Sequence, residues 1–208
     1  MNNIVKQVLC GILLLVQLPA LSQNADINIL KGINKNETKF KNKYLELCAS
    51  STTALGAGIP VGIAVAGFIT HDKKLKEDAL FMGAAWLVTG LVTQTTKRIV
   101  DRPRPFESYS FIVTRDDENG GLSFPSGHSS SAFCLATSLS LRYRKWYVIA
   151  PSYLFAGSVA WARMYQGVHY PSDVLAGAMV GAGSAWVSYK IQNWLDHKQK
   201  KRKETIPL

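Results

Sequence analysis

The sequence predicts an all-α protein: a helical bundle, transmembrane with five or six spans. Three observations support this fold class. Apolar runs at residues 50–70 and 79–95 approach the length that crosses a bilayer. No segment alternates strictly between apolar and polar residues, so strands are not expected. The connectors between apolar runs are short and rich in lysine and arginine, as is typical of the cytoplasmic side of a membrane protein.

The amino-terminal segment, residues 1–22, predicts an export signal that is either cleaved or retained as a membrane anchor. Lys6 precedes an apolar run, and Ala20 and Ser22 are small residues at the two positions that a signal peptidase reads. A retained leader gives six spans and a cleaved leader gives five. Residues 23–49 are polar and lysine-rich, and they predict an exported linker or a short amphipathic helix.

Three further apolar segments follow the first two, and each is expected to be a helix. They lie at residues 129–141, 146–161 and 174–189. Their content of Ala, Gly and Ser permits close contact between helices in a membrane. Residues 193–208 predict a basic cytoplasmic tail.

The charged connectors predict a topology. With the start of the mature chain outside, the basic connectors at residues 71–77 and 142–145 fall on the cytoplasmic side, together with the tail. The same threading places the loops at residues 96–128 and 162–173 on the outer face. A mean hydropathy of only +0.03 and the shortness of the last three helices keep a soluble exported bundle open as an alternative.

The overall charge and the cysteines exclude some classes of function. A net charge of +10 suits nucleic acid, anionic lipid or phosphate substrates. Nucleic acid is not expected as a partner, because the basic residues form no stripe interleaved with aromatic residues. Cys10, Cys48 and Cys134 have no metal-ligand spacing, so buried free thiols are expected. No metal and no cofactor are expected for this protein. Nothing in the sequence points to an oligomeric state.

Three short stretches carry the residues for phosphate chemistry. They supply three fixed cations, two imidazoles and one carboxylate, which can hold a phosphate, attack it and protonate the departing oxygen. The first stretch runs from Lys97 to Arg104 and Pro105, the second is Pro125, Ser126, Gly127 and His128, and the third contains Arg163, His169 and Asp173.

These stretches resemble the three motifs of the type 2 phosphatidic acid phosphatase family, whose active site is similar to those of bacterial class A acid phosphatases and vanadium haloperoxidases. The family pattern is Lys-x6-Arg-Pro, then Pro-Ser-Gly-His, then Ser-Arg-x5-His-x3-Asp. One position departs from it: Ala162 stands where the family usually has serine, so one phosphate contact is expected to be weaker. Residues 50–192 would form the helical phosphatase domain.

The resemblance assigns phosphate binding to Lys97, Arg104 and Arg163. Planar guanidinium groups can meet two phosphate oxygens at once, and the lysine adds a point charge. Ser126 and Gly127 precede an apolar helix, whose first backbone N–H groups are suited to an anion. A glycine there lets the backbone approach the phosphate.

His169 is the expected nucleophile, and it would form a phosphohistidine that water hydrolyses. Asp173 would accept a hydrogen bond from the other ring nitrogen and so fix the tautomer. His128 would be the general acid for the leaving oxygen. Pro171 predicts a helix start directly after the nucleophile.

The remaining charged residues near the motifs are expected to be solvent-facing. Arg98 and Arg102 are off the family pattern, so they are predicted to face solvent or lipid headgroups. Asp116 and its two acidic neighbours, followed by an Asn-Gly-Gly sequence, predict a solvated turn that could tune the approach of a charged headgroup.

The sequence thus favours an enzyme of the bacterial inner membrane with its active site facing the periplasm, and a phosphorylated lipid as substrate. Undecaprenyl diphosphate, phosphatidylglycerol phosphate and lipid A are the substrate types that the resemblance implies. The main alternative is a soluble periplasmic acid phosphatase of broad specificity. Two lesser alternatives remain. A vanadate-dependent oxidase is disfavoured because the chain is short for that class. A non-catalytic lipid-binding scaffold is disfavoured because the His169 and Asp173 pair is intact.

Overall fold

The computed structural model describes residues 22–35, 38–116 and 120–205, and within these ranges every regular element is a helix. This confirms the all-α prediction. Apart from Ser22, the predicted leader lies outside the described residues. A helix at residues 22–34 is followed by α2 (Lys39–Ile69), α3 (Lys73–Val100), α4 (Pro105–Ser108), α5 (Gly127–Arg142), α6 (Trp146–Tyr165) and α7 (Pro171–Thr205).

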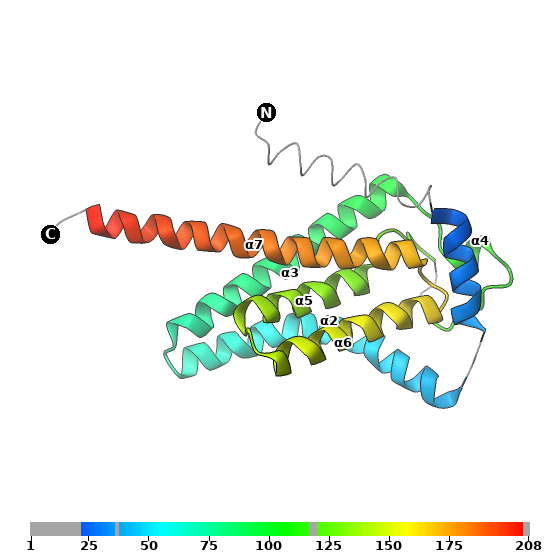
Figure 1. Ribbon diagram of the computed structural model, residues 1–208, viewed down its shortest axis with the longest axis horizontal. Coiled ribbons are helices and arrows are strands. Elements are labelled where there is room, and N and C mark those ends of the chain that lie inside the picture. Colours follow the sequence, from blue (N-terminus) through cyan, green and yellow to red (C-terminus); the bar gives the residue numbers. More distant parts are fainter. Residues whose placement is uncertain (1–21, 36–37, 117–119, 206–208) are drawn as a thin grey trace.

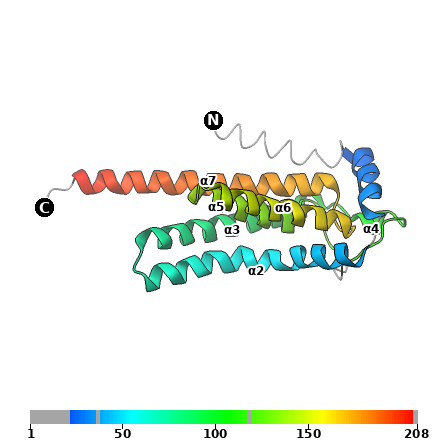
Figure 2. The same cartoon turned by 60° about the horizontal axis from the view of Figure 1, so that its bottom comes forward.

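The helices form an elongated bundle with α5 at its centre, where it contacts α2, α3, α6 and α7. Figures 1 and 2 show α2 and α3 running antiparallel along one side, with α7 as the longest helix. The helix at residues 22–34, blue in both views, lies across one end of the bundle, beside α4. Long helices therefore make the body of the molecule, and short segments close this end.

The central contact between α5 and α7 depends on small residues, as the sequence predicted. A Cβ atom on Gly177 would lie 2.6 Å from the carbonyl oxygen of Ser126, and one on Gly181 would lie 2.1 Å from that of Ser130. No side chain fits at either distance. These glycines let the two helix backbones touch, which fixes α7 against the start of α5.

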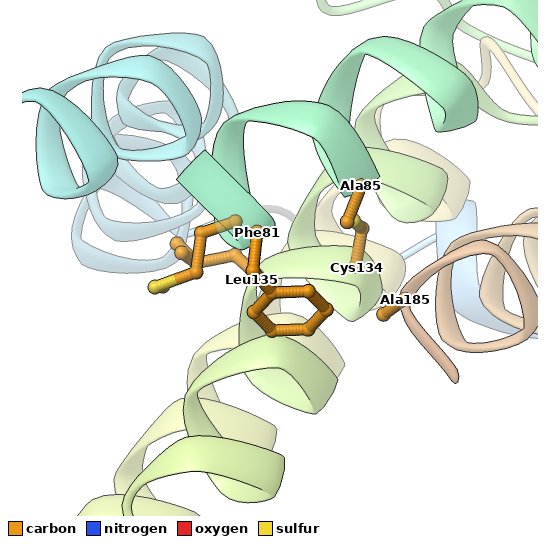
Figure 3. Packing of buried hydrophobic residues seen from close by; sticks show 6 residues of the cluster. Phe81, Ala85, Cys134, Leu135 and Ala185 are labelled. Carbon is orange, nitrogen blue, oxygen red and sulfur yellow. The ribbon is translucent and has the colours of Figure 1, made fainter. Parts of the chain in front are cut away.

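The interior contains clusters of small and medium-sized apolar side chains. Figure 3 shows one cluster, in which α3, α5 and α7 meet through Phe81, Ala85, Cys134, Leu135 and Ala185. Cys48 and Cys134 are buried free thiols, as expected.

Large apolar side chains lie mainly on the outside. Phe68 on α2, Leu80 and Leu91 on α3 and Leu154 on α6 are each between 66% and 74% exposed. Exposed apolar surface over several helices is unusual for a water-soluble bundle, which turns its apolar face inward. A lipid environment accounts for this distribution without an energetic cost.

Two of the helices in the described part of the chain are long and apolar enough to cross a membrane: Lys39–Ile69 and the segment Lys73–Ser108. The central helix α5 has 16 residues, or about 24 Å, which is shorter than a typical hydrocarbon core. The predicted count of five or six spans stays a prediction. Helix α2 begins 11 residues before the predicted apolar segment at residue 50, and α7 continues through most of the predicted basic tail.

The end of the bundle remote from α4 contains a buried ion pair. The Nε atom of Arg142 lies 3.2 Å from Oδ1 of Asp78, whose side chain is only 1% exposed. The Arg142 guanidinium also donates to the side chain of Gln192 and lies 4.6 Å from the centre of the Phe81 ring. This cluster ties α3, α5 and α7 together.

Candidate active site

The three predicted motifs come together at the end of the bundle that the helix at residues 22–34 covers. Each motif residue lies at the end of a helix or in the adjoining turn. Lys97 is in the last turn of α3, Arg104 precedes α4, Ser126 and His128 begin α5, Arg163 ends α6, and His169 and Asp173 flank the start of α7.

A cavity of about 470 Å³ opens between these elements. Among its lining residues are five of the predicted site residues: Lys97, Arg104, Gly127, His128 and His169. Thr53, Gln94 and Ser131 add neutral polar groups to its wall. Two imidazoles and two cations therefore face one space, which is large enough for a phosphate and part of the group attached to it.

The other three predicted residues lie behind the cavity wall. Ser126, Arg163 and Asp173 are each at most 2% exposed. Asp173 is close to the nucleophile candidate: its Oδ2 atom lies 3.6 Å from Nδ1 of His169. This is longer than a hydrogen bond and short enough to become one with a small movement. Because Nδ1 faces Asp173, the Nε2 edge of the ring is left for the cavity.

The carboxylate of Asp173 is held by three donors. Its Oδ1 accepts from Nη1 of Arg102 at 2.6 Å, and its Oδ2 accepts from the backbone N–H of Tyr170 at 2.9 Å and from the Ser123 hydroxyl. Donors on both oxygens favour the ionised form and fix the plane of the carboxylate. Asp173 is therefore oriented before any substrate binds.

The turn that carries His169 depends on a glycine. Gly167 has a φ of +75°, and a Cβ atom there would lie 2.7 Å from the carbonyl oxygen of Val113. Both facts exclude a side chain. The chain then turns directly into α7, whose first residue is Pro171, as predicted.

Burial lowers the pKa of His169 to about 4. The cations Arg163 and Lys97 lower it as well, whereas Asp173 acts in the opposite direction. The imidazole is therefore neutral at physiological pH, which is the state that a nucleophilic nitrogen requires.

The two cations that line the cavity are anchored by the loop before α5. Nζ of Lys97 donates to the carbonyl oxygen of Leu122. Nε of Arg104 donates to the carbonyl oxygen of Gly121 at 3.3 Å, and its backbone N–H donates to Glu107 at 3.0 Å. These contacts hold both side chains at the cavity.

Arg163 makes a contact that the sequence did not suggest. Its Nη1 lies 2.5 Å from Oδ2 of Asp116 and 3.0 Å from Oε1 of Gln166. The prediction of a solvated turn was wrong for Asp116, whose side chain is only 18% exposed. Its two acidic neighbours lie outside the described residues.

Ser126 caps α5, since its hydroxyl accepts from the backbone N–H of Ser129 at 3.4 Å. Its own backbone N–H donates to the carbonyl oxygen of Asp173 at 3.0 Å, which joins the second and third motifs. A Cβ atom on Gly127 would meet nothing nearer than Thr93, at 3.9 Å. The space above Gly127 therefore belongs to the cavity, where phosphate is expected.

Ala162, the departure from the family pattern, is fully buried. Its methyl group packs in an apolar cluster with Ile33, Leu45, Ala49 and Tyr165. The position thus contributes to packing between α6 and the segments before it.

The prediction for Arg102 was wrong. Instead of facing solvent, Arg102 is 8% exposed and bridges two carboxylates, those of Asp26 and Asp173. Arg98, in contrast, is exposed as expected. No sequence pattern indicates this role, because Asp26 and Arg102 are 76 positions apart and no spacing rule connects them.

No three His, Cys, Asp or Glu side chains gather into a metal-binding group anywhere in the described ranges. Lys97 and Arg104 supply positive charge at the cavity.

Fold and site together define a class: a helical protein in which two histidines face a cation-lined cavity and a buried aspartate lies behind one of them. The family model described as the PAP2 superfamily matches residues 78–196, and the chain belongs to this superfamily. The matched region contains all eight predicted site residues, from Lys97 to Asp173.

Two curated relatives are similar to part of the chain. The lipid A 4'-phosphatase of Bacteroides thetaiotaomicron is 38% identical over 44% of this chain and 40% of that protein. The undecaprenyl-diphosphatase of Sulfolobus acidocaldarius is 26% identical over 64% of each chain. The chain thus spans less than two thirds of either relative's length.

Among solved structures, a similar one is the transmembrane PAP2-type phosphatidylglycerolphosphate phosphatase from Bacillus subtilis. It has a TM-score of 0.74 and 24% sequence identity, with 90% of this chain and 94% of that chain covered. The arrangement of helices is therefore that of a transmembrane PAP2 protein.

Proposed function

We propose that this protein is a membrane phosphatase that removes phosphate from a lipid phosphate or diphosphate through a phosphohistidine on His169. The observation that carries the proposal is the His169 and Asp173 pair, which lies at a cavity that also contains His128 and two cations. The names of the curated relatives, a lipid A phosphatase and an undecaprenyl-diphosphatase, support a lipid as substrate.

The first chemical step transfers the phosphoryl group to the protein. Nε2 of His169 attacks phosphorus while the bond from phosphorus to the leaving oxygen breaks. His128 gives its proton to that oxygen. The positive charge that develops on the His169 ring is stabilised by Asp173, which takes a hydrogen bond from Nδ1–H. Lys97 and Arg104 balance the charge on the non-bridging oxygens.

The second step restores the enzyme. His128, now neutral, takes a proton from water as the water oxygen attacks the phosphohistidine. The bond between phosphorus and Nε2 breaks, and inorganic phosphate leaves with the added oxygen. His169 is neutral again and His128 is protonated, so the cycle closes without a further reactant.

The outer surface supports a membrane enzyme over the soluble alternative. Large apolar side chains such as Phe68, Leu80 and Leu154 are mostly exposed, and two helices are long and apolar enough to span a bilayer. A soluble acid phosphatase would have to expose this surface to water. The periplasmic orientation of the site follows from the basic connectors and is part of the proposal.

Phosphate release by the purified, detergent-solubilised full chain tests the proposal. The assay compares undecaprenyl diphosphate, lipid A, phosphatidylglycerol phosphate and p-nitrophenyl phosphate, each with EDTA present. We expect release from at least one lipid at a far higher kcat/KM than from the soluble ester, with no loss on chelation. Equal activity on the soluble ester by protein recovered without detergent would instead support the soluble enzyme.

His169→Ala is the variant that ties activity to the site. His197→Ala is its matched control, because His197 is exposed on the far part of α7. Phosphate release should vanish in the first variant and persist in the second. Full activity in His169→Ala would contradict the proposed nucleophile.

A further inference from the structure

The helix at residues 22–34 reaches into the active site through one buried carboxylate. Asp26 is 2% exposed. Its Oδ1 accepts from the backbone N–H of Ser172 at 2.9 Å, and its Oδ2 accepts from the Ser172 hydroxyl at 2.5 Å. Ser22, one turn earlier, donates to the same oxygen at 2.8 Å. Asp26 thus fixes the first turn of α7, which also carries Asp173.

Arg102 connects Asp26 to the catalytic carboxylate. Its Nη2 lies 2.9 Å from Asp26, and its Nη1 lies 2.6 Å from Asp173. Nη1 also donates to the Ser172 hydroxyl at 2.8 Å, and the guanidinium stacks 3.8 Å from the centre of the Tyr170 ring. A planar guanidinium is suited to such a bridge because its donors are fixed in one plane.

The order of charges has an electrostatic consequence. Reading outward from the nucleophile, His169 is followed by Asp173, then Arg102, then Asp26. An unshared arginine on Asp173 would compete with the imidazolium that forms on His169 for the same carboxylate. Asp26 takes part of that positive charge, so Asp173 keeps more of its capacity to stabilise the developing imidazolium.

We propose that Asp26 and Arg102 are positioning residues of the catalytic reaction, and that the helix at residues 22–34 thereby completes the active site. Neither residue lines the cavity. They act through Asp173: Arg102 sets its orientation, and Asp26 sets the orientation and effective charge of Arg102. This proposal rests on the proposed phosphatase activity.

The test begins with Asp26→Asn, assayed for phosphate release from the preferred lipid. We expect kcat to fall by about 10- to 100-fold, the range for groups that orient a ligating or catalytic side chain. KM should stay within about twofold of wild type, because the cations at the cavity are unchanged. Asp26→Glu retains the charge and should recover much of the lost kcat.

Asp101→Asn is the matched control. Asp101 precedes Arg102, is exposed, and has a φ of +49°, a backbone conformation that asparagine tolerates well. The same loss of one carboxylate charge beside Arg102 should leave kcat unchanged. Thermal unfolding of each variant in detergent shows whether a loss of kcat merely follows a loss of folded protein.

The pH profile separates positioning from a structural role. The charged and titratable groups facing His169 are Asp173 on α7, Arg163 on α6, Lys97 on α3, His128 on α5 and Arg104 before α4. Removing the negative charge of Asp26 should move the acid limb of kcat/KM to lower pH. Arg102→Gln removes a positive charge and should move it to higher pH. If the two substitutions only loosened the site, the acid limb would move in the same direction in both variants.

Two results would overturn the inference. One is an Asp26→Asn enzyme with the kcat and the acid limb of wild type. The other is a common shift of the acid limb in the Asp26→Asn and Arg102→Gln enzymes. Both outcomes leave wild-type turnover intact, so they differ from failure of the proposed function, in which wild type and Asp101→Asn would release no phosphate.

Discussion

Each end of this bundle buries an arginine against an aspartate, yet the two pairs differ in what lies beyond them. At the end remote from α4, Arg142 pairs with Asp78 and continues to Gln192. At the other end, Arg102 pairs with Asp26 and Asp173. Both arginines also stack on aromatic rings.

The difference is that only one pair contacts a reactive group. Asp173 faces the ring of His169, whereas Asp78 contacts no titratable group in the motifs. A buried ion pair is therefore not a mark of function by itself, since its formation carries a desolvation cost in either place. Whether the pair has a catalytic role depends on the group beside the aspartate carboxylate. Variants at Asp26, Arg102 or Asp173 should change turnover, and variants at Asp78 or Arg142 should change stability.

The largest effect on turnover is expected at His169. His169→Ala removes the nucleophile, so kcat should fall by roughly 10⁴-fold or more, the scale for loss of a member of a catalytic triad. Phosphate release and circular dichroism, measured against His197→Ala, check both activity and fold. If His169→Ala kept its helices and more than a few per cent of the wild-type kcat, the catalytic site would not lie at this end of the bundle.

A smaller and substrate-dependent effect is expected at His128. His128→Ala should lower kcat by roughly 10²- to 10⁴-fold for a lipid monoester, whose alkoxide leaves poorly without a proton. A diphosphate has a better leaving group and should lose less. Parallel assays on the two substrates give the ratio, and equal losses would argue against proton donation by His128.

The next effect is set by the pKa of His169. Because burial lowers this pKa to about 4, the neutral nucleophile is present above pH 4 and is lost as the pH falls through that value. At pH 5 this gives roughly 30-fold more neutral imidazole than an ordinary histidine would have. NMR titration of labelled histidine, with His169→Ala for assignment, measures the value. A midpoint near 6.5 would show that the ring is hydrated.

The smallest effect on turnover is expected at the opposite end. Asp78→Asn leaves Arg142 buried without its counter-charge, which should cost about 3–5 kcal/mol of stability and leave kcat unchanged. Glu77→Gln, at the neighbouring and more exposed carboxylate, is the control. Unfolding in detergent and kcat are measured on the same samples. A marked loss of kcat in fully folded Asp78→Asn would show that both ends of the bundle affect turnover.

The motif residues could be found from the sequence because each functional group has a fixed local spacing. His169 and Asp173 are one helical turn apart, and Ser126 to His128 mark a helix start. The apolar runs likewise gave the helices, although not their full lengths, because polar ends such as that of α7 continue a helix beyond the membrane segment.

The supporting residues could not be found in this way. Asp26 contacts Ser172 across 146 positions, and Asp116 contacts Arg163 across 47. No local sequence pattern connects the members of either pair, because only tertiary packing brings them together. Arg102 was misjudged for the same reason: an arginine is normally solvent-exposed unless a partner is known.

A trapping experiment shows whether His169 carries the phosphoryl group during turnover. Purified protein is mixed with a lipid phosphate labelled in its phosphate and quenched with alkali during turnover. We expect label on the wild-type protein that is stable in alkali and lost in acid, as for a phosphorus–nitrogen bond, and no label on His169→Ala. Label of the same kind on His169→Ala, or turnover without any labelled protein at every quench time, would contradict it.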